Sequence, residues 1–377
     1  MDDILPEWVI RAVPEHIFSI PAYVPGKPLA ELKRELGISG AVKMASNENP
    51  LGTSAKALEA IQRVAGDAHI YPEGSAPDLR RAIGDRFGLS PESVILGNGS
   101  DEIMQFAAHL FIRPGCEALV GSHTFSWYRI CVEAFGGSVK AVPMKDYRFD
   151  LAATARAVTD LTRLIFLAFP NNPTGTIVSR EEFESFLRDL PTEGLLIVLD
   201  EAYREFVTER DCPNAVDYIF SKPPVLVLRT FSKIHGLAGL RVGYGLAQPW
   251  LVELLNRLRP PFNVNSVAQS AALAALGDAE HLAASLTLCE GGRSFIHKEL
   301  AGLGLKVIPS QANFVTFCLE QDARPVYEGL LREGVIVRHL ASFGMEKCIR
   351  VTVGRREDNT RFLGALRKVM ADLKLSV

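Results

Sequence analysis

The sequence predicts an α/β protein whose large domain is a mostly parallel sheet with helices on both faces, joined to a smaller α+β domain. Short apolar runs alternate with helical segments through the middle of the chain, which is typical of parallel sheets covered by helices. These runs are residues 118–120, 164–168, 195–199 and 225–228. Beyond residue 260 the alternation stops, and a long helical stretch precedes several strand-like segments. With 377 residues the chain is long enough for two domains.

The composition excludes several classes of protein. The formal net charge is -3, so the chain lacks the basic surface that nucleic acid requires. No apolar run approaches the length of a membrane span, and the acidic, proline-broken start does not resemble a signal peptide. The six cysteines are scattered, with no CxxC pair and no metal-ligand spacing. We therefore expect reduced thiols, no metal site, no membrane contact and a cytoplasmic location.

Residues 1–42 are predicted to form an N-terminal arm that also contributes to the small domain. Prolines at positions 6, 14, 21, 25 and 28 forbid one long helix and favour an extended path. One short helix is expected at residues 29–36. The large domain is predicted at 43–262 and the small domain at 263–377, because the proline-containing segment 260–265 breaks the pattern between them.

The next elements bring a glycine-rich turn to the start of a helix. Two helices and a buried strand are predicted at residues 55–64, 78–87 and 94–96. The turn that follows, GNGSDE at 97–102, opens a helix that runs to residue 110. Such a unit presents free backbone N–H groups and the helix dipole to an anion. Alternatively, Ser100 or Asp101 simply caps the helix.

Polar or aromatic residues follow four successive strands at the point where each strand ends. They are Phe125, Asn172, Asp200 and Lys233. Ligands of open parallel sheets bind at the carboxyl ends of the strands. We therefore expect these four side chains to converge on one pocket.

The most informative stretch is residues 225–243, where an apolar strand leads to a single lysine. Lys233 follows the strand among hydroxyl residues, and burial at such a place lowers the pKa of an amine, as Schiff-base chemistry requires. Thr230, Ser232 and Arg241 add hydroxyl donors and a fixed positive charge suited to a phosphate. A lysine beside a phosphate site is what pyridoxal 5′-phosphate (PLP) requires. On this stretch alone, a surface lysine in a polar loop is the alternative.

The C-terminal part is predicted to be helical over 266–303 and then to form strands around a closing helix. The strands and the closing helix are expected at residues 306–308, 314–317, 335–337, 349–353 and 358–373. Arg338 and Arg350 lie at these strands. Each is either an anion-binding group or an ordinary surface arginine.

Taken in order, the motifs of this chain resemble those of the fold-type I PLP-dependent aminotransferases, and more closely those of the histidinol-phosphate aminotransferase family. The motifs related to PLP are NPTG at 172–175, DEAY at 200–203, SK at 232–233 and Arg241. The more specific ones are YVPGKP at 23–28, SNENPLG at 46–52, YP at 71–72, GNGSDE at 97–102 and RVTVG at 350–354. The resemblance runs from about residue 20 to the C-terminus and implies the fold-type I architecture, with a mostly parallel mixed sheet in the large domain.

The resemblance also implies roles for individual residues toward PLP. Lys233 would hold the cofactor as a Schiff base and then move a proton. Asp200 would keep the pyridine nitrogen protonated, and Phe125 would stack on the ring. Asn172 and Tyr203 would donate to the phenolic oxygen. The phosphate would be held by the backbone N–H groups of Ser100 and Asp101 together with Thr230, Ser232, Arg241 and Tyr71.

For the assembly and the substrate, the resemblance implies a homodimer in which Tyr71 reaches the phosphate from the other subunit. Tyr23 and Asn49 would lie over the mouth of the pocket. Arg350, with Arg338, would bind an anionic group. A planar guanidinium pairs bidentately with a carboxylate or a phosphate, so this pair suits both glutamate and histidinol phosphate.

The expected reaction interconverts L-histidinol phosphate plus 2-oxoglutarate and imidazole-acetol phosphate plus L-glutamate, in histidine biosynthesis. An aromatic aminotransferase acting on phenylalanine or tyrosine is the alternative, because Tyr23 and Phe125 could pack such a ring. A threonine-phosphate decarboxylase shares the fold and could use the same two arginines. A ligand-sensing regulator would need a DNA-binding segment, for which the short arm has no room.

Overall fold

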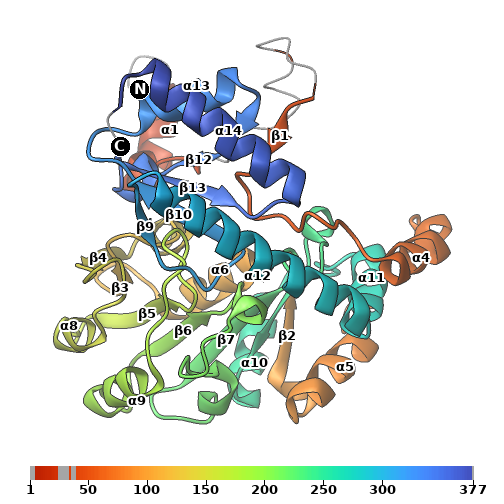
Figure 1. The fold of residues 1–377 in the computed structure, drawn as a ribbon. Coiled ribbons are helices and arrows are strands. Elements are labelled where there is room, and N and C mark those ends of the chain that lie inside the picture. The colour runs from red at the N-terminus through yellow and green to blue at the C-terminus, as the bar shows by residue number, and fades with distance from the viewer. Residues whose placement is uncertain (1–4, 24–33, 35–39, 376–377) are drawn as a thin grey trace.

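The structure is a computed structural model that describes residues 5–23, 34 and 40–375 (Figure 1). The helix predicted at 29–36 falls almost entirely outside these described residues. Two short helices begin the described part, α1 (Glu7–Ala12) and α2 (Glu15–Ser19). Within the described ranges, no helix has both the length and the apolar character needed to cross a membrane.

A seven-stranded mixed sheet forms the centre of the large domain. Its strand order is β2-β8-β7-β6-β5-β3-β4, and β8 runs antiparallel to all the other strands. The strands are β2 (Val94–Gly97), β3 (Glu117–Gly121), β4 (Ser138–Val142), β5 (Thr162–Ala168), β6 (Leu196–Asp200), β7 (Val225–Thr230) and β8 (Gly243–Leu246). The four apolar runs predicted as strands are confirmed as β3, β5, β6 and β7. Strands β4 and β8 were not predicted, because β4 is a largely exposed edge strand and β8 reads GYGL.

Helices cover both faces of this sheet, which explains why its strands are apolar without alternation. On β5, Leu164 and Phe166 pack toward one face, whereas Ile165 and Leu167 pack toward the other. One face is covered by α6 (Ser100–Phe111), α7 (Trp127–Ala134) and α10 (Pro249–Asn256). The other is covered by α4 (Ala55–Val64), α5 (Pro77–Phe87), α8 (Leu151–Arg156), α9 (Arg180–Asp189) and α11 (Ser266–Leu276).

The small domain is built on a four-stranded antiparallel sheet in the order β12-β13-β10-β9, and a two-stranded parallel pair β1-β11 lies in the same domain. These strands are β1 (Val42–Lys43), β9 (Lys306–Ile308), β10 (Phe314–Cys318), β11 (Val335–Ile336), β12 (Arg338–His339) and β13 (Cys348–Thr352). Its helices are α12 (Ala279–Gly302), α13 (Arg324–Arg332) and α14 (Arg356–Asp372). Because β1 pairs with β11, we propose that the N-terminal segment contributes to the small domain.

The two domains meet along α12, the long helix that runs from the small-domain sheet toward α11 in Figure 1. The buried alanines of α11 belong to the core of the large domain, whereas Cys289, Ile296 and Leu300 of α12 belong to the core of the small one. The helical stretch predicted at 266–303 is two helices, because Asp278 caps a new one by accepting from the His281 N–H group at 3.3 Å. We therefore propose a domain boundary within α12, later than residue 262.

Two cysteines differ from the expectation of reduced thiols. Cys318 and Cys348 form a disulfide between β10 and β13. The register of the sheet places these residues directly opposite each other, a proximity that their separation of 30 residues in the chain did not indicate. The remaining cysteines, Cys116, Cys131, Cys212 and Cys289, are free and buried.

Candidate active site

A cavity of about 350 Å³ lies at the carboxyl ends of β5, β6 and β7, and residues of both domains line it. Nearly all the side chains predicted for the site meet there, as expected for residues that follow successive parallel strands. They are Tyr23, Ser100, Asp101, Phe125, Asn172, Asp200, Tyr203, Thr230, Ser232, Lys233, Arg241, Arg338 and Arg350. Of the residues predicted for the site, Asn49 and Tyr71 do not line this cavity.

Lys233 enters the cavity from the loop after β7. The Ser232 N–H group donates to Thr230 Oγ1 at 3.1 Å, which turns the chain where the strand ends. The Lys233 Nζ atom donates to the Ser46 carbonyl at 3.2 Å and lies 5.7 Å from the centre of the Tyr203 ring. A second lysine of the lining, Lys43, is ion-paired with Glu48 at 2.6 Å. Lys233 has no such carboxylate contact among the described residues, so its amine is the one available for chemistry.

Asp200 ends β6 and is a buried carboxylate, 8% exposed. The Tyr128 hydroxyl donates to Asp200 Oδ2 at 2.7 Å, and the Ala202 N–H group donates to Oδ1 at 3.0 Å. Burial raises the pKa of Asp200 to about 6, while these two hydrogen bonds act to lower it. Tyr128 is itself fully buried, stacked on Phe166 with ring centres 4.9 Å apart. Sequence reasoning missed Tyr128, because no local pattern in the sequence relates it to Asp200, 72 residues later.

The N-terminus of α6 and Arg241 form a cradle for an anion. Gly99 precedes the helix with φ 85°, and no side chain caps it, so neither Ser100 nor Asp101 plays the capping role considered above. Arg241 Nη2 lies 3.1 Å from Asp101 Oδ2 at this helix end. A Cβ atom on Gly99 would lie 2.4 Å from Arg241 Nη2, so glycine lets the guanidinium approach the free N–H groups. Free amides, a helix dipole and a cation together suit a phosphate.

Arg350 is a buried cation with no acidic partner in the part of the chain that the structure describes. It is 5% exposed, and its Nη2 donates to the Ala45 carbonyl at 2.7 Å while Nη1 contacts Asn172 Oδ1. Its Nε is buried without a hydrogen-bond partner, and no carboxylate among the described residues forms an ion pair with it. Arg338 lies directly opposite on β12, and like charges in such a pair are destabilising. Burial, with the Arg338 charge, lowers the pKa of Arg350 to about 10. The cavity therefore favours an anionic ligand here.

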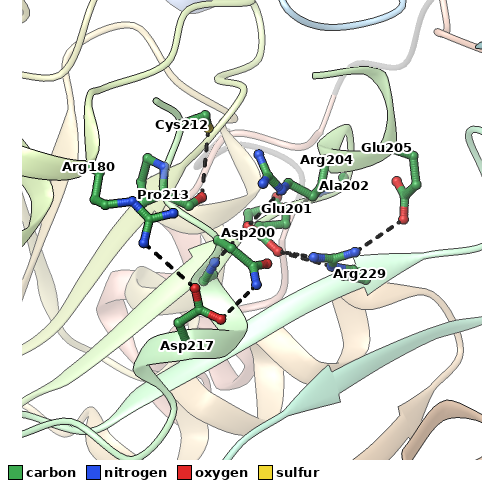
Figure 2. A network of polar contacts seen from close by, with 12 residues as sticks. Arg180, Asp200, Glu201, Ala202, Arg204, Glu205, Cys212, Pro213, Asp217 and Arg229 are labelled. Atoms are coloured by element: carbon green, nitrogen blue, oxygen red, sulfur yellow. Dashed lines mark hydrogen bonds and ion pairs between the residues drawn. The ribbon is translucent and has the colours of Figure 1, made fainter. Parts of the chain in front are cut away.

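A buried ion pair fixes the strand ends that carry the site (Figure 2). Arg229 on β7 donates from Nη2 and Nε to Glu201 Oε2 at 2.7 and 3.0 Å, and it lies 3.6 Å from Glu205 Oε1. Glu201 also accepts from the Ala215 N–H group at 3.1 Å. Removing one partner of a buried pair destabilises a fold by about 3–5 kcal/mol. This pair therefore holds Asp200 and Thr230, the neighbours of Glu201 and Arg229, in register.

The aromatic residues at the cavity differ in their exposure. Phe125 and Tyr23 meet edge to face with ring centres 6.1 Å apart, and Tyr23 is 45% exposed at the mouth. Tyr71 is 79% exposed and stacks on Phe262, with ring centres 4.7 Å apart. Neither Tyr71 nor Phe262 lines the cavity of its own chain.

Asn49 needs a correction, because the structure places it away from the mouth of the cavity. Its amide donates to the Ile234 carbonyl at 2.7 Å and to Ser285 Oγ at 2.9 Å, so it ties its loop to both domains. Asn47, two residues earlier, does line the cavity and donates to the Tyr203 hydroxyl at 2.9 Å. The motif was correctly singled out, but sequence alone did not show which asparagine faces inward.

The site has two places for an anion, the α6 cradle and Arg350, with the Lys233 amine and the Asp200 carboxylate in the same cavity. This arrangement is typical of enzymes that bind a cofactor as a Schiff base on a lysine. Residues 39–366 match the family described as aminotransferase class I and II. The chain belongs to this family.

Similar proteins agree with that assignment. A histidinol-phosphate aminotransferase of Moorella thermoacetica is 46% identical, over 95% of this chain and 92% of the relative. A histidinol-phosphate aminotransferase 2 of Pseudomonas fluorescens is 48% identical, over 93% and 95%. A crystal structure of histidinol-phosphate aminotransferase from Sinorhizobium meliloti in complex with pyridoxal-5′-phosphate superposes with a TM-score of 0.89 at 30% identity, covering 96% of this chain and 98% of that one. The family and the fold-type I architecture predicted from the sequence are confirmed.

Proposed function

We propose that this chain is a PLP-dependent histidinol-phosphate aminotransferase of histidine biosynthesis. It interconverts L-histidinol phosphate plus 2-oxoglutarate and imidazole-acetol phosphate plus L-glutamate. The observation that carries the proposal is that Arg350 lines the same cavity as Lys233 and the α6 cradle. It is buried there, and no carboxylate among the described residues forms an ion pair with it. The α6 cradle would then bind the cofactor phosphate, and Arg350 would bind the anionic group of the substrate. The names of the similar proteins support this choice of substrate.

The residues present fit PLP, which when bound supplies an electron sink for bonds at the substrate Cα. The α6 N-terminus, Thr230, Ser232 and Arg241 would hold the phosphate. Asp200, ionised and held by the Tyr128 hydroxyl, would pair with the pyridine nitrogen and keep it protonated. Phe125 would stack on the ring face, Asn172 and Tyr203 would donate to the phenolic oxygen, and Lys233 would bind the aldehyde carbon.

The residues of the chain then divide the work of the reaction. The Lys233 amine would accept the proton from the substrate Cα as a general base and then return it as a general acid. Tyr203 and Asn172 donate hydrogen bonds that hold the ring in place. Tyr23, at the mouth, helps to exclude water. Arg350 with Arg338 binds the carboxylate of glutamate or the phosphate of histidinol phosphate, because a guanidinium pairs bidentately with either.

The active form is a homodimer in which the partner subunit completes the phosphate site. The exposed Tyr71–Phe262 stack supports this arrangement, since two large aromatic residues stand in solvent on this chain alone. The proposed location is the cytoplasm; the free, buried thiols Cys116, Cys131, Cys212 and Cys289 fit a reducing compartment, whereas the Cys318–Cys348 disulfide does not.

Subunit mixing tests the shared site. Tyr71→Phe is expected to weaken PLP retention, and Lys233→Ala to be inactive. Each hybrid dimer of the two variants contains one site with native Tyr71 and native Lys233, and one site with neither. About half of the dimers in an equal mixture are hybrids, so the mixture should recover roughly a quarter of wild-type activity. No recovery in hybrids confirmed by mass would contradict a site built across the dimer.

The pH dependence of cofactor binding tests the Tyr128–Asp200 contact. As the pH falls through about 6, Asp200 takes up a proton and loses the charge that pairs with the pyridine nitrogen. Tyr128→Phe removes a hydrogen bond that lowers this pKa, so the midpoint of the affinity loss should move up by about one pH unit. The measurement is a fluorescence titration of the apoprotein with PLP at each pH.

Tyr218→Phe is the matched control for this titration. Tyr218 also donates to a carboxylate, Glu184 at 3.0 Å, but it does not line the cavity. In Tyr218→Phe the midpoint of the loss of PLP affinity with pH should equal that of the wild type. An equal shift in both variants would contradict a specific role for Tyr128.

The substrate is tested by a single half-reaction without a keto acid. Holoenzyme is mixed with histidinol phosphate, phenylalanine or threonine phosphate, while conversion of the cofactor to its amine form and release of carbon dioxide are followed. Rapid conversion with histidinol phosphate alone is expected. Comparable conversion with phenylalanine would make the chain an aromatic aminotransferase, and carbon dioxide from threonine phosphate would make it a lyase.

A further inference from the structure

The segment 44–47 connects the small domain to the principal groups of the cavity. Its carbonyl groups accept hydrogen bonds from Arg350 at Ala45 and from Lys233 at Ser46, at 2.7 and 3.2 Å. Met44 at its start is hydrogen-bonded to small-domain strands, through its N–H to Ile336 and its carbonyl to Thr352. The position of this segment therefore depends on the small domain, while its hydrogen bonds reach residues of both the large and the small domain.

Asn47 makes the contact with Tyr203 in this segment. Its side chain is 1% exposed, and Nδ2 lies 2.9 Å from the Tyr203 hydroxyl oxygen. Its backbone has φ 56°, a left-handed conformation that asparagine tolerates better than most residues. The Asn47 carbonyl accepts from Asn313 Nδ2 at 3.0 Å. The residue is thus fixed on both its main chain and its side chain.

Thr352 decides which end of the Asn47 amide faces Tyr203. The Asn47 N–H group donates to Thr352 Oγ1 at 2.9 Å, and the Thr352 hydroxyl donates to Asn47 Oδ1 at 3.0 Å. With its oxygen used in this way, Asn47 turns its NH₂ group toward Tyr203. Because the Tyr203 oxygen accepts from Asn47, the Tyr203 hydroxyl proton is free to donate to another group. Tyr203 lines the cavity, so this proton can point into it.

We propose that Asn47 is a positioning residue, which directs the Tyr203 hydroxyl proton into the cavity and links this orientation to the small domain through Thr352 and Asn313. The inference rests on the proposed function, in which Tyr203 donates to the phenolic oxygen of the cofactor. A donor at that oxygen stabilises its negative charge, and so lowers the pKa of the linkage between Lys233 and the cofactor. Arg350 lies two residues before Thr352 on β13, so the strand that binds the substrate anion also holds Asn47.

Asn47→Asp reverses one hydrogen bond with little change of shape. The carboxylate still accepts from Thr352, but it also accepts from Tyr203 and so takes the hydroxyl proton away from the cavity. The readout is the pH titration of the absorbance of the lysine-bound cofactor in the resting holoenzyme. Asn47→Asp is expected to raise the midpoint by about one pH unit, in the same direction as Tyr203→Phe.

The double variant separates hydrogen-bond direction from the added charge. In the Tyr203→Phe background, Asn47→Asp should shift the midpoint no further, because the hydroxyl it acts through is absent. Shifts that add in the double variant, or no shift in Asn47→Asp, would overturn the proposal. A wild-type protein that shows no absorbance of lysine-bound PLP would instead overturn the proposed function.

Asn47→Gly covers the case in which Asn47→Asp does not fold. Glycine keeps the left-handed backbone and removes only the side chain. The Tyr203 hydroxyl then has no fixed orientation, so a smaller upward shift is expected. A midpoint equal to that of the wild type, in a protein with native thermal unfolding, would also overturn the proposal.

Discussion

Lys233→Ala is expected to abolish covalent retention of the cofactor and to lower turnover by about 10⁴-fold or more, because one amine serves both as the attachment point and as the proton carrier. The structure supports a single candidate for this role. Lys233 Nζ has only the Ser46 carbonyl as a hydrogen-bond partner among the described residues. The measurements are the absorbance of purified holoenzyme and kcat with histidinol phosphate.

Lys43→Ala is the matched control, since Lys43 is the other lysine that lines the cavity. Its charge is paired with Glu48, so its removal should leave the cofactor absorbance in place. Full activity of Lys233→Ala, or loss of the absorbance in Lys43→Ala alone, would contradict the assignment of Lys233.

Arg350→Ala is expected to lower kcat/KM by about 10²-fold or more for both glutamate and histidinol phosphate, because truncating one side of a buried charged contact costs several kcal/mol. Arg350 is buried, and no carboxylate among the described residues forms an ion pair with it, so we expect its charge to be used by a bound anion. Steady-state kinetics with each substrate measure the two effects separately.

Arg350→Lys distinguishes charge from geometry. Lysine keeps the positive charge but loses the two-pronged pairing, so partial activity is expected with both substrates. A variant that impairs only one of the two substrates would contradict the idea that both anions share this arginine. The same comparison in Arg338→Ala shows how much the opposite arginine contributes.

The sequence was sufficient to predict five of the seven strands of the central sheet and to predict that side chains at their ends line one cavity, and the reason is topological. Strands β5, β6 and β7 are buried on both faces, so they stand out as apolar runs. Parallel strands bring their carboxyl ends to one edge, which is why Asn172, Asp200 and Lys233 could be expected together.

The features that were not predicted depend on contacts between segments distant in the chain. The Tyr128–Asp200 and Asn47–Tyr203 hydrogen bonds join residues 72 and 156 positions apart. The Cys318–Cys348 disulfide depends on the register of β10 and β13, which local patterns do not determine. Asn47 and Asn49 belong to the same motif, and only the path of the folded loop decides which one faces the cavity.

The most direct test of the central claim, that this cavity holds PLP on Lys233, is chemical trapping followed by peptide mapping. Borohydride reduction of the holoenzyme converts a Schiff base into a stable amine, and mass spectrometry of the digest then locates the added mass. One pyridoxyl-phosphate group is expected, on the peptide that contains Lys233. A label on Lys43, or a protein that carries no label after incubation with PLP, would contradict it.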